Sequence, residues 1–138
     1  MKGKKHRTTF IRIQAGGVVD EIDAQHLEPS HWMLFVVSNE DTSNAPHKYT
    51  LSFDPQADIV NKETRTVVKN LLTTTALQKV ALMPGEVDTI RVQFQPKGSF
   101  GNGNTFPYTT YKYTLHLKDD TSGTTVDIDP DFDIAPPN

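Results

Sequence analysis

The chain has 138 residues, no cysteine and a formal net charge of −3 at pH 7. This length is typical of one domain and is sufficient to bury a substantial core, while the absence of cysteine excludes disulfides and thiolate chemistry. No run approaches the roughly 20 consecutive apolar residues that a membrane-spanning helix requires.

The charge is unevenly distributed. Residues 1–12 hold five lysines and arginines and no acid, which leaves nine bases against seventeen acids in the remainder. A basic tail over residues 1–7 could contact nucleic acid or a membrane surface. The acidic remainder argues against nucleic acid as the main partner, because contacts with its backbone need a basic face on the folded domain. We therefore expect a solvated tail and neither nucleic acid nor membrane as partner. The basic start lacks the apolar stretch of a signal peptide, which predicts a cytoplasmic protein; a secreted protein trimmed of its signal would show the same pattern.

The first predicted strands are marked by apolar and polar residues that alternate with period two. Residues 8–14 alternate and predict a strand that ends at Gly16-Gly17, and residues 18–23 predict a short second strand. Residues 26–30 predict a loop. Residues 31–38 are almost continuously apolar, which is typical of a central strand buried on both sides.

The middle of the chain alternates between turn-forming and strand-forming segments. Residues 39–46 are turn-formers, and residues 47–53 alternate again as a strand. Residues 57–62 are compatible with one helical turn. Residues 64–72 and 77–83 are rich in valine, threonine and leucine, which favours strands.

The last third predicts three further strands and one long loop. Their ranges are 87–94, 111–117 and 124–134 for the strands and 95–107 for the loop. Eight or nine short strands separated by turn signals predict an all-β fold, a Greek-key sandwich or barrel. We expect one such domain over residues 8–134, followed by a short tail at residues 135–138.

Four segments, in this order, resemble the cupredoxin family of copper-binding β-sandwiches. They are Asn39 to His47 followed by Leu51 and Phe53; Met83-Pro84-Gly85-Glu86 followed by Ile90, Val92 and Phe94; Tyr111-x-Tyr113-x-Leu115; and Asp129-Pro130-Asp131 with Ile134. The resemblance implies a cupredoxin-like sandwich of about eight strands, in which His47 matches the first copper histidine. The last segment is similar to the terminal strand of copper-free bacterial relatives.

The chain departs from that family at the metal ligands. A blue-copper site requires two histidines and a thiolate, with a weak axial ligand that is often methionine. Only His47 has a counterpart here, Leu115 stands where the family places its thiolate, and residues 117–123 contain no histidine or methionine. The resemblance therefore points to the copper-free branch and to a protein without a cofactor. A role for His47 in packing or capping beside Pro46 is favoured over a role as metal ligand.

Four aspartates near the end of the chain form a second candidate metal site. On a strand, Asp127, Asp129, Asp131 and Asp133 would share one face at intervals of roughly 6.5–7 Å, and their oxygens could hold a hard cation such as calcium. The favoured alternative is an edge strand that charge and Pro130 keep from pairing with other molecules.

The loop at residues 95–107 is long for a connection between neighbouring strands, which is typical of a binding loop. Phe100 and Phe106 flank Gly101-Asn102-Gly103-Asn104, so Phe100, Asn102, Asn104 and Phe106 are candidates for a mobile binding arm. In the alternative that we favour, both phenylalanines cap the sandwich. No serine lies in a Gly-x-Ser-x-Gly elbow, and no catalytic constellation is present, so we expect no enzyme.

Two hypotheses of function follow. The first is a non-catalytic interaction or structural module that meets a protein partner or a second copy of itself. The second is a cation-binding or small-ligand-binding domain that uses His47 or the aspartates. For the core, residues on the inward register of each strand are expected, namely Trp32, Leu34, Val36, Tyr49, Leu51, Phe53, Ile90, Val92, Phe94, Tyr111, Tyr113 and Leu115. Truncating Leu115 should lower stability strongly, whereas truncating the outward-facing His116 should barely change it.

Overall fold

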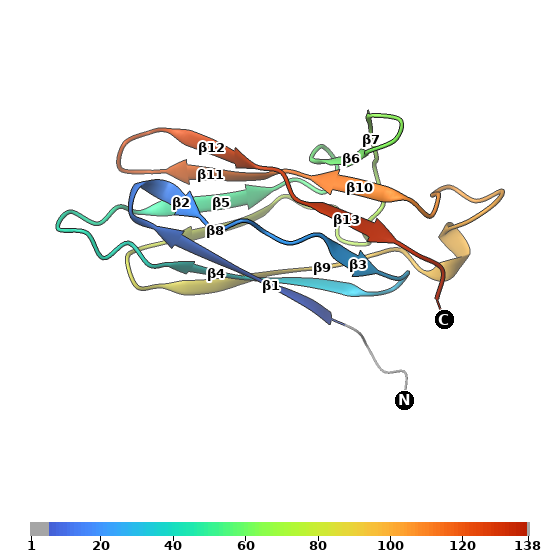
Figure 1. The fold of residues 1–138 in the computed structure, drawn as a ribbon, viewed down its shortest axis with the longest axis horizontal. Helices are drawn as coiled ribbons and strands as arrows, with labels where there is room; N and C mark the ends of the chain where they lie inside the picture. The colour runs from blue at the N-terminus through green and yellow to red at the C-terminus, as the bar shows by residue number, and fades with distance from the viewer. Residues whose placement is uncertain (1–5, 138) are drawn as a thin grey trace.

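The computed structural model describes residues 6–137, which form two layers of β-structure packed face to face (Figure 1). The first layer is one sheet of order β2-β1-β4-β9, in which β1 runs parallel to β4 and β4 runs antiparallel to β9. Its strands are β1 (His6–Gln14), β2 (Val18–Val19), β4 (Trp32–Asn39) and β9 (Val87–Gln93). We call this the first sheet.

The second layer consists of two sheets joined end to end. One has the order β12-β11-β5-β8 and the other the order β3-β13-β10-β6-β7. Only Thr114 separates β10 from β11, and only Asp129-Pro130 separates β12 from β13, so both strand pairs continue from one sheet into the other (Figure 1). The strands are β3 (Gln25–Leu27), β5 (Tyr49–Phe53), β6 (Ile59–Asn61), β7 (Thr66–Val67), β8 (Gln78–Leu82), β10 (Thr110–Tyr113), β11 (Leu115–Asp119), β12 (Thr125–Ile128) and β13 (Asp131–Ile134).

Turns and longer loops join these strands, and two of these connections contain 3-10 helices, η1 (Ala15–Gly17) and η2 (Lys97–Ser99). The turn between β8 and β9 shows how the sequence specifies such a connection. Gly85 has a φ of 85°, and the Glu86 amide donates to the Met83 carbonyl at 3.0 Å. A proline followed by a residue with positive φ is the pattern of a type II turn, which is why glycine follows Pro84. In the part of the chain that the structure describes, no helix is long and apolar enough to cross a membrane.

Aromatic rings fill the space between the layers. Tyr113 lies 5.7 Å from Phe35 of the first sheet, 6.1 Å from Phe53 and 5.7 Å from Phe132, measured between ring centroids. Tyr111 stacks on Phe132 at 5.4 Å. All five side chains are at most 1% exposed. Such ring pairs add stabilisation to the large area that each ring buries, so strands distant in the sequence are joined at this cluster.

The predicted all-β sandwich is confirmed, but it contains more than the expected eight strands. Residues 6–137 form thirteen strands. β3 and β6 lie where a loop and a helical turn were predicted, and two long alternating runs are interrupted. The run at residues 111–117 breaks at Thr114, whose amide donates to the Asp58 carbonyl at 2.9 Å. The run at residues 124–134 breaks at Asp129-Pro130, where proline has no amide to donate to a neighbouring strand.

The predicted register of β4 is wrong. Trp32, Leu34 and Val36 are only half-buried, while the core positions belong to Met33, Phe35 and Val37, which are at most 2% exposed. Apolar residues occupy both the odd-numbered and the even-numbered positions of β4, so the pattern of this strand does not show which face lies against the core. Nine other predicted core residues are buried: Tyr49, Leu51, Phe53, Ile90, Val92, Phe94, Tyr111, Tyr113 and Leu115.

Several predicted boundaries also require correction. Residues 57–62 form a turn followed by β6 rather than a helical turn, and only Thr66–Val67 of residues 64–72 form a strand. The predicted loop at residues 26–30 includes the end of β3, and the predicted strand at residues 18–23 is shortened to β2. β1 starts at His6, within the predicted basic tail; residues 1–5 of that tail lie outside the described part of the chain.

Candidate functional site

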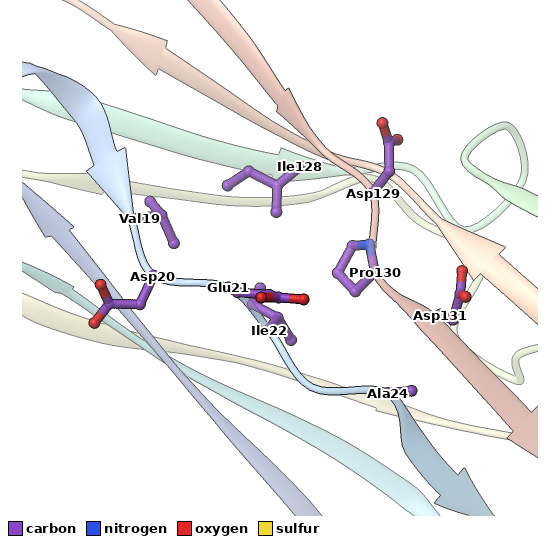
Figure 2. A pocket seen from close by; sticks show the side chains of 9 residues that line it. All are labelled: Val19, Asp20, Glu21, Ile22, Ala24, Ile128, Asp129, Pro130 and Asp131. Carbon is purple, nitrogen blue, oxygen red and sulfur yellow. The ribbon is translucent and has the colours of Figure 1, made fainter.

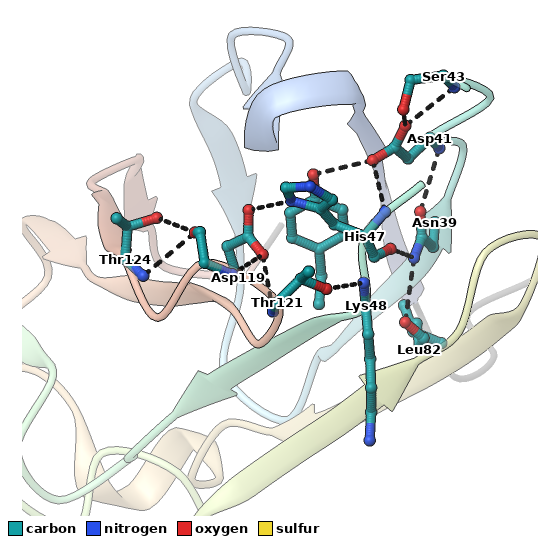
Figure 3. A network of polar contacts seen from close by, with 11 residues as sticks. Asn39, Asp41, Ser43, His47, Lys48, Leu82, Asp119, Thr121 and Thr124 are labelled. Atoms are coloured by element: carbon teal, nitrogen blue, oxygen red, sulfur yellow. Dashed lines mark hydrogen bonds and ion pairs between the residues drawn. The ribbon is translucent and has the colours of Figure 1, made fainter. Parts of the chain in front are cut away.

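His47 lies in a network of polar contacts at one end of the second layer (Figure 3). Its Nδ1 donates to Asp119 Oδ2 at 2.6 Å. The other carboxylate oxygen of Asp119 accepts the amides of Thr121 and Ser122 at 2.9 and 3.0 Å, which closes the turn after β11. Burial raises the pKa of Asp119, but the hydrogen bonds from His47 and from this turn outweigh burial and lower the pKa overall.

Asp41 organises the loop that precedes His47. Its carboxylate accepts the Ser43 hydroxyl at 2.6 Å, the His47 amide at 2.9 Å and the Tyr49 hydroxyl at 3.2 Å. These bonds, with the Ser43 hydroxyl contributing most, lower the pKa of Asp41 to about 2. Next to it, the side-chain Nδ2 of Asn39 donates to the backbone carbonyls of His47 and Leu82. The polar groups of this network form hydrogen bonds with one another. From this geometry, we infer that they hold the loop before His47 in place.

The register of β11 separates His47 from Leu115. Tyr49 pairs with Asp119, and Leu51 pairs with Leu117, so Leu115 lies four residues farther along the strand, roughly 13 Å at the strand rise. The residue beside His47 is Asp119 instead. The expectation that Leu115 occupies the thiolate position of a site containing His47 is therefore wrong. Leu115 is fully buried in the core.

The four candidate aspartates do not come together. Each carboxylate contacts a different side chain, and Asp129-Pro130 separates β12 from β13. These contacts are Asp127 with His116 (2.8 Å), Asp129 with Thr114 (2.7 Å), Asp131 with Lys62 (2.5 Å) and Asp133 with His26. Within residues 6–137 no group of three or more histidines and acids is placed to hold a metal ion. β12 is an edge strand as expected, whereas β13 pairs on both sides with β10 and β3.

His116 has partners that its outward position on β11 did not reveal. Its Nε2 lies 2.9 Å from Asp58 and its Nδ1 lies 2.8 Å from Asp127. The hydrogen bond with Asp58 is the largest cause of a raised pKa at His116. A protonated imidazole donates to both carboxylates and so links β11 to β12 and to the turn before β6. The expectation that truncating His116 barely changes stability does not fit this contact pair.

A surface cleft of about 340 Å³ lies between residues 19–24 and residues 128–131 (Figure 2). Four acids line it: Asp20, Glu21, Asp129 and Asp131. Figure 2 shows the carboxylates of Asp20 and Asp129 pointing away from each other on opposite walls. Such an arrangement does not focus oxygen ligands on one point, as a hard cation requires.

The candidate binding loop folds back on the sandwich. Phe100 and Phe106 are 3% and 6% exposed, and their ring centroids lie 5.6 Å apart. The Gly101 amide donates to the Phe106 carbonyl at 2.9 Å, and the Asn104 side chain donates to the Phe100 carbonyl at 2.8 Å. Asn102 lines an open surface pocket together with Gly101, Pro107 and Tyr108. The geometry therefore favours the capping alternative for both phenylalanines.

The outer face of the first sheet carries an apolar patch of five residues, of which Trp32, Leu34 and Val36 were predicted to lie in the core. On this face Phe10 pairs with Val36, and Leu34 and Trp32 continue the same side of β4. Phe10 is 62% exposed and Val87, on the neighbouring strand β9, is 60% exposed. We call these five residues the outer patch. Because the inner side of the same sheet already packs on the core, no second layer of the described chain covers the patch.

The charges around the outer patch are positive. Arg12 and Arg91 project from the same face, and no outward-facing residue of β1, β4 or β9 is an acid. The Arg91 guanidinium lies 3.9 Å from the centroid of the Trp32 ring, a cation–π arrangement. Arg12 lies 3.8 Å from Glu40, which follows the end of β4. An apolar centre with tryptophan and arginine beside it has the composition of a protein-binding surface.

Fold and surface together define an all-β sandwich with one exposed apolar sheet face. No protein-family model matches the chain, and no curated protein matches it. Among solved structures, the chain is similar to auracyanin B, a cupredoxin, with 14% sequence identity and a TM-score of 0.37. The match covers 99% of this chain and 93% of that chain.

Proposed function

We propose that the chain is a non-catalytic interaction module that binds a protein partner through the outer patch. The observation that carries the proposal is the exposed apolar side of a sheet whose other side already forms the core. Large apolar patches on a soluble domain mark interaction sites. Tryptophan and arginine are the residue types that contribute most to the energy of protein interfaces, and Trp32 and Arg91 lie in contact here.

The charge on this face selects the kind of partner. The positive charge that Arg12 and Arg91 place on this face favours a partner with carboxylates, because the outward-facing residues of β1, β4 and β9 include no acid. A symmetric dimer through this face would add two further arginines and still no strand carboxylate. The partner we infer therefore has an apolar contact surface bordered by aspartate or glutamate.

The copper-free cupredoxin-like assignment belongs to the same proposal. It is supported by the absence of cysteine from the chain and by Asp119, which caps a turn beside His47 where copper chemistry would require a soft ligand. In this proposal the polar network around His47 keeps the loops of that end in place. The contacts with other molecules lie on the first sheet.

Selection from a random peptide library displayed on phage tests the proposed partner chemistry. We expect enriched peptides that combine aromatic or aliphatic residues with aspartate or glutamate. Their binding should be lost in Phe10→Asp, which changes an exposed residue of the outer patch. A matched control is Val126→Asp, because Val126 is an exposed valine on β12 of the other layer.

Two results would contradict the proposal. In one, the selected peptides bind wild type and Phe10→Asp equally well, which would place the interaction elsewhere on the molecule. In the other, sedimentation velocity shows a dimer that Phe10→Asp dissociates, which would make a second copy of this chain the occupant of the outer patch. A folded Phe10→Asp variant, checked by circular dichroism, is required for either conclusion.

A further inference from the structure

In the second layer, the β6–β7 hairpin lies beside β10 (Figure 1). A basic cleft of about 400 Å³ is formed there by residues of β6, of β10 and of the turn after β6. It is lined by Val60, Lys62, Arg65, Lys112 and Thr114. Three of these five residues are cations and none is an acid, in a chain whose net charge is −3. The volume lies within the range of small-molecule sites.

The fold brings these cations together from separate elements. Val60 of β6 pairs directly with Lys112 of β10, so the two side chains are neighbours on one side of the sheet. In the turn after β6, Asn61 Oδ1 accepts the amides of Glu63 and Thr64 at 2.9 and 3.2 Å. Asn61 is 8% exposed. The turn that carries Arg65 is therefore fastened to the body of the sheet by a largely buried side chain.

Arg65 has a left-handed backbone conformation in this turn. Its φ is 61°, which is uncommon for a residue other than glycine, asparagine or aspartate. The Arg65 amide donates to the Asn61 carbonyl at 2.7 Å, which holds the conformation in place. Arg65 is the last residue of the loop that joins β6 to β7, where a left-handed residue is a common way to close a hairpin, and its guanidinium lies at the wall of the basic cleft.

The two lysines are held by carboxylates outside the lining, while Arg65 is not. Lys62 Nζ lies 2.5 Å from Asp131, and Lys112 Nζ lies 3.9 Å from Asp129. Arg65 makes no ion pair within residues 6–137. The two aspartates balance two of the three cations, so one positive charge remains, and it is that of Arg65. The planar guanidinium of arginine can donate two parallel hydrogen bonds to a phosphate group.

We infer that the basic cleft binds the phosphate group of a phosphorylated small molecule. The Arg65 guanidinium donates hydrogen bonds to two phosphate oxygens, and the ammonium groups of Lys62 and Lys112 supply further positive charge. Val60 contacts the uncharged part of the ligand. The site lies in the other layer from the outer patch, so it is independent of the proposed protein partner.

Amide NMR spectra of the full chain, titrated with inorganic phosphate, with sulfate and with glucose 6-phosphate at constant ionic strength, test this inference. We expect saturable shifts confined to residues 60–65 and 110–114, with the sugar phosphate bound more tightly than either bare ion. Arg65→Gln should weaken phosphate binding about tenfold or more, because a hydrogen bond to a charged group contributes about 1.5–3 kcal/mol. Asp131→Asn should tighten binding because it releases Lys62.

The matched control is Lys79→Gln, which removes an equal charge from β8, outside the basic cleft. Equal weakening by Lys79→Gln and Arg65→Gln would overturn the site, since it would show a general effect of net charge. Shifts that rise linearly without saturation would overturn it as well. Equal affinity for sulfate and for the sugar phosphate would overturn the assignment to a phosphorylated small molecule.

Discussion

Replacing Val37 and Val36 by alanine, one at a time, measures which side of β4 faces the core. The two residues are adjacent valines in the middle of one strand, so differences in strand propensity cancel between the variants. Val37 is fully buried and pairs with Ile11 of β1. Val36 pairs with Phe10 on the outer face and is half-buried. Only the environment of the lost methyl groups differs.

The expected losses follow from that difference. Two fully buried methyl groups are worth about 1.6 kcal/mol in transfer free energy, and the cavity left behind adds to this. Val37→Ala should therefore lower the free energy of unfolding by about 2–3 kcal/mol, and Val36→Ala by less than about 1 kcal/mol. Urea denaturation followed by circular dichroism measures both values. Equal losses, or a larger loss for Val36→Ala, would refute the register and remove the outer patch with it.

Four further substitutions test the core and one ion pair. Leu115→Ala should cost about 2–5 kcal/mol in urea melts, since Leu115 is fully buried; a loss below 1 kcal/mol would contradict its packing. Tyr113→Phe should be neutral or stabilising by up to about 1 kcal/mol, because the Tyr113 hydroxyl has no hydrogen-bond partner within residues 6–137. Tyr111→Phe should instead destabilise the protein by about 1 kcal/mol, because it removes the 2.6 Å hydrogen bond from the Tyr111 hydroxyl to a backbone carbonyl. His116→Asn should lower stability more at pH 5.5 than at pH 9. The hydrogen bond with Asp58 is the main reason that the pKa of His116 is raised above 6.5 in the folded state. The stabilisation by His116 is therefore complete below pH 6.5 and is lost as the pH rises through the folded pKa. A loss that does not change with pH would exclude the ion pair.

The strands that could be predicted are those with one polar and one apolar side. In residues 49–53, the large apolar side chains Tyr49, Leu51 and Phe53 are all buried as expected, because alternation with period two specifies which side meets the core. The pattern weakens where a segment is short. β6 and β7 together hold five residues, and their formation depends on pairing with β10, a contact between distant segments that a local pattern does not contain.

The candidate site could be predicted less well than the fold, for a related reason. His47 and the aspartates are residue types that bind metals, and the sequence shows only that they are present. Their chemistry depends on partners far along the chain, such as Asp119 for His47 and Lys62 for Asp131. Once each carboxylate has its own donor, it is no longer a shared ligand for an ion. In the sequence, Lys62 and Arg65 look like ordinary surface charges. They form a cleft with Lys112 only because the β6–β7 hairpin folds beside β10.

The error in β4 and the proposed function have one physical cause. A strand in a two-layer sandwich needs only one apolar side, and the other side is usually polar. β4 has Met33, Phe35 and Val37 on the core and places large apolar residues on the opposite side too. The sequence therefore predicted a strand buried on both sides, and the described chain covers only one of them. If a partner covers the outer patch, the original prediction describes β4 in the complex, where Trp32, Leu34 and Val36 would form the core of the interface.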